Sequence, residues 1–182
     1  EELRLWAEEE GRKHVPLNVG IGLNSGIACV GNMGSEQRFD YSVLGDTVNT
    51  AARLEGQSKT YGVDIVIGEE TKKGAVGYAT LELDLIQVKG KTEAVRIFGL
   101  MGKPDVATSD WFLKLKEKHE ALIEAYRGQR WDEAIALGKE CRQIRGELHI
   151  DGFYDLIDER VEVFREAPPP ADWDGVFIAT SK

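Results

Sequence analysis

The sequence predicts an α+β fold followed by a helical extension, and two observations indicate this division. Of the 20 glycines, 15 lie in residues 1–103 and 5 in residues 104–182; frequent glycine is typical of strands joined by turns, and scarce glycine fits helices. Between these parts, residues 103–110 lack hydrophobic periodicity and contain Pro104. This composition predicts a linker that ends in a helix N-cap at Ser109 or Asp110. We therefore expect two units, 1–103 and 104–182.

Strand and helix patterns alternate in the first unit. Residues 17–23 alternate apolar with small or polar side chains, and with the turn at 24–26 and the apolar run 27–30 they predict a β-hairpin. Further elements are expected at 46–59 (a helix capped by Asp46), 63–67 (a buried strand), 69–73 (a helical turn), and 80–88 with 95–100 (an antiparallel pair). This order predicts a sheet with helices on one side.

Apolar residues at helical spacing predict a helical hairpin in the second unit, broken at residues 128–130. Residues 121–134 resemble one tetratricopeptide (TPR) repeat. A lone repeat cannot bury its own apolar face, so packing against the first unit and recognition of a peptide both stay open. A third helix is expected near 152–165. Beyond it, Trp173 lies in a short acidic tail and is expected to dock on its own domain.

Composition argues against two classes of partner. The 23 basic and 32 acidic side chains give a net charge of −9, which disfavours binding to a nucleic-acid backbone. No apolar run reaches the length of a membrane-spanning helix, and no signal peptide is evident. Cys29 and Cys141 are too few for a disulfide framework. We expect a cytoplasmic chain, either by itself or as the cytoplasmic part of a membrane-anchored protein.

The stretch 40–55 holds the candidate functional residues. Asn49 and Arg53 stand four residues apart, so they project from one face of the expected helix. An amide beside a permanently charged guanidinium suits a phosphate-bearing ligand, although the same spacing is common on solvated helix faces. Other sites fail: residues 20–26 have the wrong spacing for a dinucleotide-binding loop. His14, His119 and His149 share no metal-ligand spacing.

Five segments, in order, resemble the class III nucleotidyl cyclases, which make cyclic AMP or cyclic GMP. They are residues 19–26, 30–35, 41–55, 61–63 and 88–91, and the resemblance covers nearly all of 15–101. It implies a ferredoxin-like core, of which this chain holds the latter half with an unpaired sheet edge. The C-terminal sequence looks like that of bacterial members whose upstream part is a membrane-anchored CHASE-type sensor.

The resemblance implies a role for each candidate residue. Asn49 would orient the ribose, and Arg53 would neutralise charge that develops at the α-phosphate. Lys91, or else Lys89, would hold the triphosphate. Ser42 occupies a position that selects the base, and its hydroxyl favours ATP over GTP, with guanylate cyclase activity as an alternative.

The resemblance also implies a site shared between subunits. The family holds two Mg²⁺ or Mn²⁺ ions with two aspartates that precede the region matching Leu17, and those motifs are absent here. Asp40, Asp46, Asp64 and Asp84 lie outside such motifs. In a head-to-tail homodimer this chain would supply the Asn49 and Arg53 half only, so we expect it to be inactive alone. A non-catalytic cyclase-like module that binds a nucleotide or a protein is the alternative.

Overall fold

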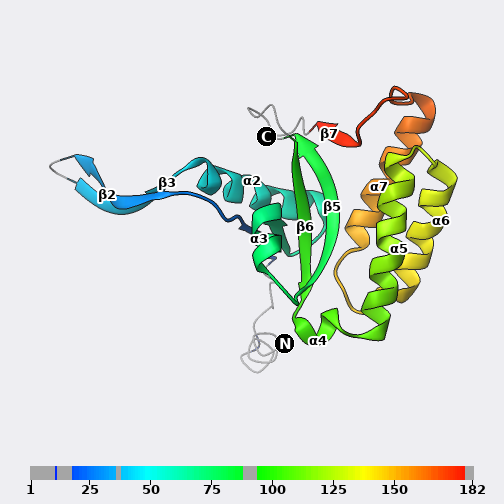
Figure 1. The fold of residues 1–182 in the computed structure, drawn as a ribbon, viewed down its shortest axis with the longest axis horizontal. Helices are drawn as coiled ribbons and strands as arrows, with labels where there is room; N and C mark the ends of the chain where they lie inside the picture. The colour runs from blue at the N-terminus through cyan, green and yellow to red at the C-terminus, as the bar shows by residue number, and fades with distance from the viewer. Residues whose placement is uncertain (1–10, 12–17, 36–37, 88–93, 179–182) are drawn as a thin grey trace.

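The computed structural model describes residue 11 and residues 18–35, 38–87 and 94–178. A five-stranded sheet has the order β1-β4-β6-β5-β7, and β2 and β3 form a separate two-stranded sheet. We call this second sheet the arm. Figure 1 shows the arm projecting on one side of the main sheet, while α5, α6 and α7 pack together on the opposite side. Among the described residues, no helix has the length and apolar character needed to cross a bilayer.

The first part of the chain carries most of the sheet. Its elements are β1 (Ile21–Leu23), β2 (Cys29–Ser35), β3 (Arg38–Leu44), α2 (Asp46–Tyr61), β4 (Ile65–Gly68), α3 (Glu69–Gly74), β5 (Ala79–Gln87) and β6 (Val95–Gly102). The antiparallel pairing of β5 with β6 confirms the second predicted strand pair. A mixed fold of sheet and helices is confirmed with it.

The predicted hairpin of residues 17–30 is wrong. β1 pairs in parallel with β4, with Ile21 opposite Ile65, whereas β2 pairs with β3. Beyond β1 the Asn24 amide donates hydrogen bonds to the backbone carbonyl and the hydroxyl of Thr47, at 3.2 and 2.9 Å. These bonds tie the turn to the start of α2, so the chain leaves the sheet there and forms the arm.

Helix α2 lies directly on β1 because glycines leave room for it. A Cβ atom on Gly22 would lie 2.2 Å from both the carbonyl oxygen of Ala51 and the backbone nitrogen of Glu55, and one on Gly20 would lie 2.0 Å from the Ser58 hydroxyl. Such distances are far below van der Waals contact, so any larger side chain would displace the helix. The middle of α2 is thereby held at a fixed height above the sheet.

The N-terminus of α2 differs from expectation in one respect. Its N-cap residue is Gly45, and no side chain caps it by a hydrogen bond. Asp46 is instead the first helical residue, so its predicted capping role is wrong. A carboxylate in the first turn still interacts favourably with the positive end of the helix dipole.

The linker is helical over part of its length. Pro104 begins the short helix α4 (Pro104–Ala107) instead of breaking a helix, because proline fits the first helical position, where no N–H donor is needed. The predicted cap at Ser109 is confirmed: its hydroxyl accepts from the Phe112 N–H at 3.4 Å, at the start of α5.

The extension consists of α5 (Asp110–Arg127), α6 (Trp131–Ile144), α7 (Asp151–Glu166) and β7 (Val176–Ile178). The helical hairpin is present, and its likeness to a TPR repeat stays a prediction. Trp173 packs against Tyr126 and Phe164, with ring centres 5.5 and 5.3 Å apart, so it docks on its own chain as expected. Strand β7 was not predicted; it pairs in parallel with β5 and covers that edge of the sheet.

One hydrophobic core runs from α2 through the sheet into the extension. Because this core includes residues from both sides of residue 103, it does not separate two units, and the division near residue 103 stays a prediction. Its largest fully buried members are Leu54, Tyr61, Leu81, Leu83, Ile86, Ile97, Phe112, Leu115, Tyr126, Phe153 and Tyr154.

His119 makes the stability of this core depend on pH. Its ring is fully buried, and Nε2 lies 2.6 Å from the carbonyl oxygen of Glu82. Burial lowers the pKa of His119 to about 4, although the carbonyl partly opposes this shift. The unfolded chain therefore binds this proton from about pH 6.5 downward and the folded chain does not, so stability falls between about pH 6.5 and 4. We expect a loss of about 3 kcal/mol from this group by pH 4.

Urea denaturation of the wild type and His119→Gln across this pH range measures the effect. As the pH is lowered from about 6.5 to 4, the free energy of unfolding should fall less for the variant than for the wild type. Equal slopes for the two proteins would contradict the assignment.

Candidate active site

Helix α2 displays Asn49 and Arg53 together. The buried face of this helix consists of Thr50, Leu54, Ser58 and Tyr61, and Asn49 and Arg53 each precede one of these residues by one position. They therefore lie on the flank of the helix beside its buried face, with Asn49 turned further from it than Arg53. Asn49 is exposed and Arg53 is half-buried.

Among the described residues, the polar ends of Asn49 and Arg53 have no hydrogen-bond or ion-pair partner. A guanidinium without an internal carboxylate partner keeps its full charge and its five donors available for a ligand. The geometry thus permits the chemistry expected from the sequence.

Ser42 lies on the strand that leads into this helix. It is half-buried on β3, opposite Gly31 of β2, and β3 ends at Leu44 just before α2 begins. The structure thus brings Asn49 and Arg53 onto one face and Ser42 onto the adjoining strand. The predicted phosphate-binding lysines, Lys89 and Lys91, lie outside the described residues.

The arm carries exposed apolar side chains, which is unusual for a projecting hairpin. Val30, Val43 and Leu44 are 55%, 43% and 60% exposed, and Tyr41 is 76% exposed. Ile27, just before the arm, is 97% exposed. By strand alternation Tyr41, Val43 and Val30 share one face of the arm and Leu44 lies on the other, and exposed apolar groups gathered on one face are typical of interaction surfaces.

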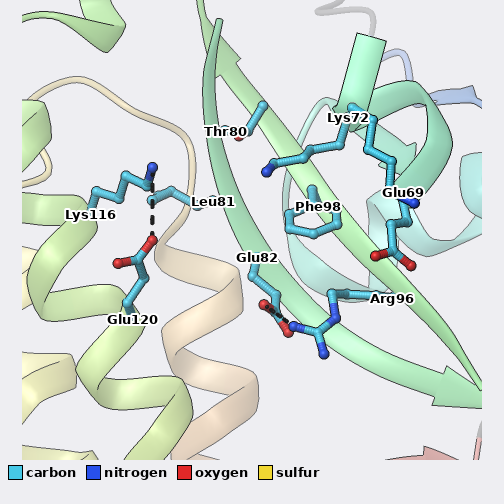
Figure 2. A pocket seen from close by; sticks show the side chains of 10 residues that line it. Glu69, Lys72, Thr80, Leu81, Glu82, Arg96, Phe98, Lys116 and Glu120 are labelled. Atoms are coloured by element: carbon cyan, nitrogen blue, oxygen red, sulfur yellow. Dashed lines mark hydrogen bonds and ion pairs between the residues drawn. The ribbon is translucent and has the colours of Figure 1, made fainter. Parts of the chain in front are cut away.

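Two hollows lie elsewhere on the sheet. The first, about 260 Å³, lies between α3, β5, β6 and α5, and neither Asn49 nor Arg53 lines it. Figure 2 shows two ion pairs in this hollow: Arg96 bonds to Glu82 at 3.0 Å, and Lys116 pairs with Glu120 at 3.8 Å. Lys72 also lines the hollow and lies over the Phe98 ring, so the charges of the hollow are only partly paired with one another.

The second hollow, about 440 Å³, lies at the start of α2. Asp46, Thr47 and Thr50 line one side of it and Arg96 another. The Thr50 hydroxyl is buried and, among the described residues, has no hydrogen-bond partner. The lining has three carboxylates, those of Asp46, Glu69 and Glu70, against the one guanidinium of Arg96, so it does not favour an anionic triphosphate.

The described aspartates do not form a metal site. No group of three or more His, Cys, Asp or Glu side chains among the described residues is arranged to hold a metal ion. Asp64 lies 3.5 Å from His149, and Asp84 is paired with Arg160. The Asp84 carboxylate is therefore already neutralised.

A buried charged cluster joins the end of α2 to the extension, and sequence reasoning missed it. We call Tyr61, Asp84 and Arg160 the brace. The Tyr61 hydroxyl and Arg160 Nη1 each donate to Oδ2 of Asp84 at 2.6 Å, and Arg160 Nη2 lies 3.3 Å from the Tyr61 oxygen. The guanidinium also lies 3.5 Å from the centre of the Phe177 ring.

Burial controls the ionisation of the brace. Burial raises the pKa of Tyr61 well above its usual value, and the Asp84 carboxylate raises it further, so the phenol stays protonated as a donor. For Arg160, burial lowers the pKa, but Asp84 together with Tyr61 and Tyr126 more than offsets this, so the net shift of the pKa is upward. The brace is therefore a charged pair with a neutral phenol. One sequence signal was available: Arg160 interrupts the apolar face formed by Ile157 and Val161 on α7.

Sequence comparison then identifies the first part of the chain. The family model for the adenylate and guanylate cyclase catalytic domain matches residues 3–102, just over half of the 182 residues. The chain belongs to this cyclase family. Asn49, Arg53 and Ser42 fall inside the matched cyclase domain, as do Tyr61 and Asp84, whereas Arg160 falls outside it.

Relatives of the cyclase domain include known adenylate cyclases. The chain is 38% identical to the adenylate cyclase of Anabaena cylindrica over 95 residues, which cover 50% of this chain and 19% of that protein. It is 29% identical over 139 residues to the terminal-differentiation specific adenylate cyclase of Dictyostelium discoideum, covering 74% of this chain and 6% of that protein. The matched parts thus span less than a fifth of either relative.

A solved structure is also similar. The crystal structure of the adenylyl cyclase CyaB from P. aeruginosa aligns with a TM-score of 0.47 and 31% sequence identity. The alignment covers 55% of this chain and 50% of that one.

Proposed function

We propose that this chain supplies the Asn49 and Arg53 half of a nucleotidyl cyclase site that converts ATP to 3′,5′-cyclic AMP and pyrophosphate. The observation that carries the proposal is the pair of side chains on one face of α2 that have no polar partner among the described residues, inside a region that matches the cyclase family. The relatives named adenylate cyclases support the same substrate.

The proposed chemistry is an in-line displacement at the α-phosphorus. The ribose 3′-oxygen forms a bond to this phosphorus, the bond from phosphorus to the pyrophosphate leaving group breaks, and the proton of the 3′-hydroxyl passes to solvent water. Negative charge accumulates on the phosphoryl oxygens and the leaving group. Arg53 donates fixed, charged hydrogen bonds to these oxygens, and Asn49 orients the ribose. Lys91 or Lys89 holds the terminal phosphates.

Cyclases generally use Mg²⁺ or Mn²⁺, and the described residues of this chain do not fit such ions. Asp84 is neutralised by Arg160, and no acidic cluster of metal-binding size is found among the described residues. We therefore assign no step to a metal held by these residues. None of the remaining residues is an aspartate, so the two ions of the proposed site would be held by aspartates that this 182-residue sequence does not contain.

A head-to-tail homodimer would bring those aspartates to Asn49 and Arg53. The exposed apolar arm adjoins α2 and offers a surface for the second subunit. Exposed groups such as Tyr41 and Val43 would lose contact with water in such a dimer, which favours association.

Ser42 leads us to expect that the intact gene product, of which this chain forms part or all, turns over ATP faster than GTP. A serine hydroxyl both donates and accepts, so it suits the amino group of adenine. Cyclic nucleotide formation with each substrate, in Mg²⁺ and in Mn²⁺, measures the preference.

Ser42→Ala should reduce the discrimination between the two substrates. A preference for GTP would instead indicate a guanylate cyclase. No cyclase activity with either substrate would favour a non-catalytic module.

A further inference from the structure

We propose that the extension positions the catalytic helix α2 through the brace, so that Tyr61, Asp84 and Arg160 are positioning residues for the cyclase reaction. This inference rests on the proposed function, because it concerns the helix that carries Asn49 and Arg53. It assigns a role in the reaction to α7, which lies outside the region matched to the cyclase family.

The brace attaches at the last residue of α2. Tyr61 ends the helix and donates to Asp84 of β5, while Arg160 reaches the same carboxylate oxygen from α7. Tyr61, Asp84 and Arg160 are 1%, 2% and 6% exposed. Three elements from distant parts of the sequence therefore meet at one desolvated point, where a charged hydrogen bond is far stronger than in water.

The backbone adds a second attachment next to the first. Gly62 caps α2 in the left-handed conformation, with φ of 61°, and a Cβ placed on it would lie 2.7 Å from the Cα of Gly152 in α7. The backbone at the end of α2 is thus in direct contact with the backbone at the start of α7. The end of α2 cannot shift relative to α7 without opening this contact.

These attachments reach Arg53 through the helix itself. α2 contains no proline and is one continuous helix of 16 residues, and it also rests on β1 at Gly22, beneath Ala51 and Glu55. A helix held at its middle and at one end has a fixed tilt and a fixed rotation about its axis. Arg53 is two turns from Tyr61, so a shift at the brace tilts or rotates its guanidinium. Misplacement by about 1 Å can cost about a hundredfold in rate.

In this proposal the brace positions α2 without contacting the nucleotide. Its three polar groups are turned to one another and are buried, whereas Asn49 is exposed. Substitution of the brace should therefore change the chemical step and leave nucleotide binding by other groups in place. The expected signature is a fall in kcat with little change in KM.

The test is a double-mutant cycle in the intact protein. The brace is replaced by apolar groups, Asp84→Leu with Arg160→Met, because paired apolar replacement avoids leaving a buried charge unpaired. We expect kcat for ATP to fall about tenfold and KM to change less than twofold. In the Arg53→Ala background, the same replacement should lower kcat less than twofold, because the group that it positions is already gone. Arg165→Met, on α7 but partly exposed, should leave kcat unchanged in both backgrounds.

Hydrogen exchange gives a second measurement that does not depend on activity. Amides in residues 49–57 should exchange faster in the apolar brace variant than in Arg165→Met. The proposal is overturned if these amides are unaffected, or if the brace variant lowers kcat equally in both backgrounds. Absence of cyclase activity from the unsubstituted protein would overturn the proposed function and this inference with it, whereas equal losses in an active enzyme would overturn this inference alone.

Discussion

Replacing Arg53 by alanine should lower turnover of ATP by the intact protein at least a hundredfold. In the proposed site its guanidinium donates to oxygens that gain charge only as the bond to pyrophosphate breaks. Loss of one such donor costs about 3 to 4 kcal/mol of barrier. Because Arg53 makes no internal hydrogen bond or ion pair among the described residues, the thermal midpoint of unfolding should change little. Steady-state kinetics and a melting curve on the same preparation measure both quantities.

Lys59→Ala is the matched control for this prediction. Lys59 is an exposed cation in the last turn of the same helix, so its loss changes the net charge equally without touching the proposed site. Turnover should stay within about twofold of wild type. If Arg53→Ala retains wild-type turnover, the assignment of Arg53 to the transition state is wrong.

Replacing Arg160 by methionine should lower the free energy of unfolding by about 3 to 5 kcal/mol, because it leaves the Asp84 carboxylate buried without its cation. Chemical denaturation of the chain measures this loss. Adding Asp84→Leu should restore much of the stability, since an apolar pair removes the stranded charge.

Arg165→Met provides the comparison on the same helix. Arg165 is 39% exposed and pairs with Asp132, which is 99% exposed, so its loss should cost less than about 1 kcal/mol. Equal losses for the two arginine variants would show that burial of the brace adds nothing to stability.

Side-chain periodicity in the sequence predicted those helices and strands that depend on neighbouring residues and not on contacts with distant parts of the chain. The helix predicted at 46–59 and the strands predicted at 80–88 and 95–100 correspond to α2, β5 and β6, whose observed bounds differ by at most two residues. The pairing of β1 with β4 did not follow, because the turn at Asn24 could lead either to a hairpin or out of the sheet. The contacts that distinguish the two are long-range, among them the hydrogen bonds of Asn24 to Thr47, 23 residues away, and the pairing of β1 with β4. β7 is three residues long, which is too short for an alternation of apolar and polar side chains to be recognised.

The residues of the candidate site also fall into those that local sequence patterns predict and those that depend on long-range packing. Asn49 and Arg53 were found because their spacing on one helix is a local property. The brace was missed because Asp84 and Arg160 are 76 residues apart and their pairing depends on how α7 packs. A charged residue on the apolar face of an amphipathic helix was the available clue, since a buried cation requires a partner.

Mixing two inactive variants of the intact protein tests the central claim most directly. One carries Arg53→Ala, and the other retains Arg53 but has the two metal-binding aspartates replaced, which we propose to lie in a part of the intact protein that this sequence does not contain. In a head-to-tail dimer, a mixed pair regains one of its two sites, and half of randomly formed dimers are mixed. We therefore expect cyclic AMP formation to recover to roughly a quarter of the wild-type rate. A mixture as inactive as its components would contradict a site in which Arg53 serves the metal ions of the partner subunit.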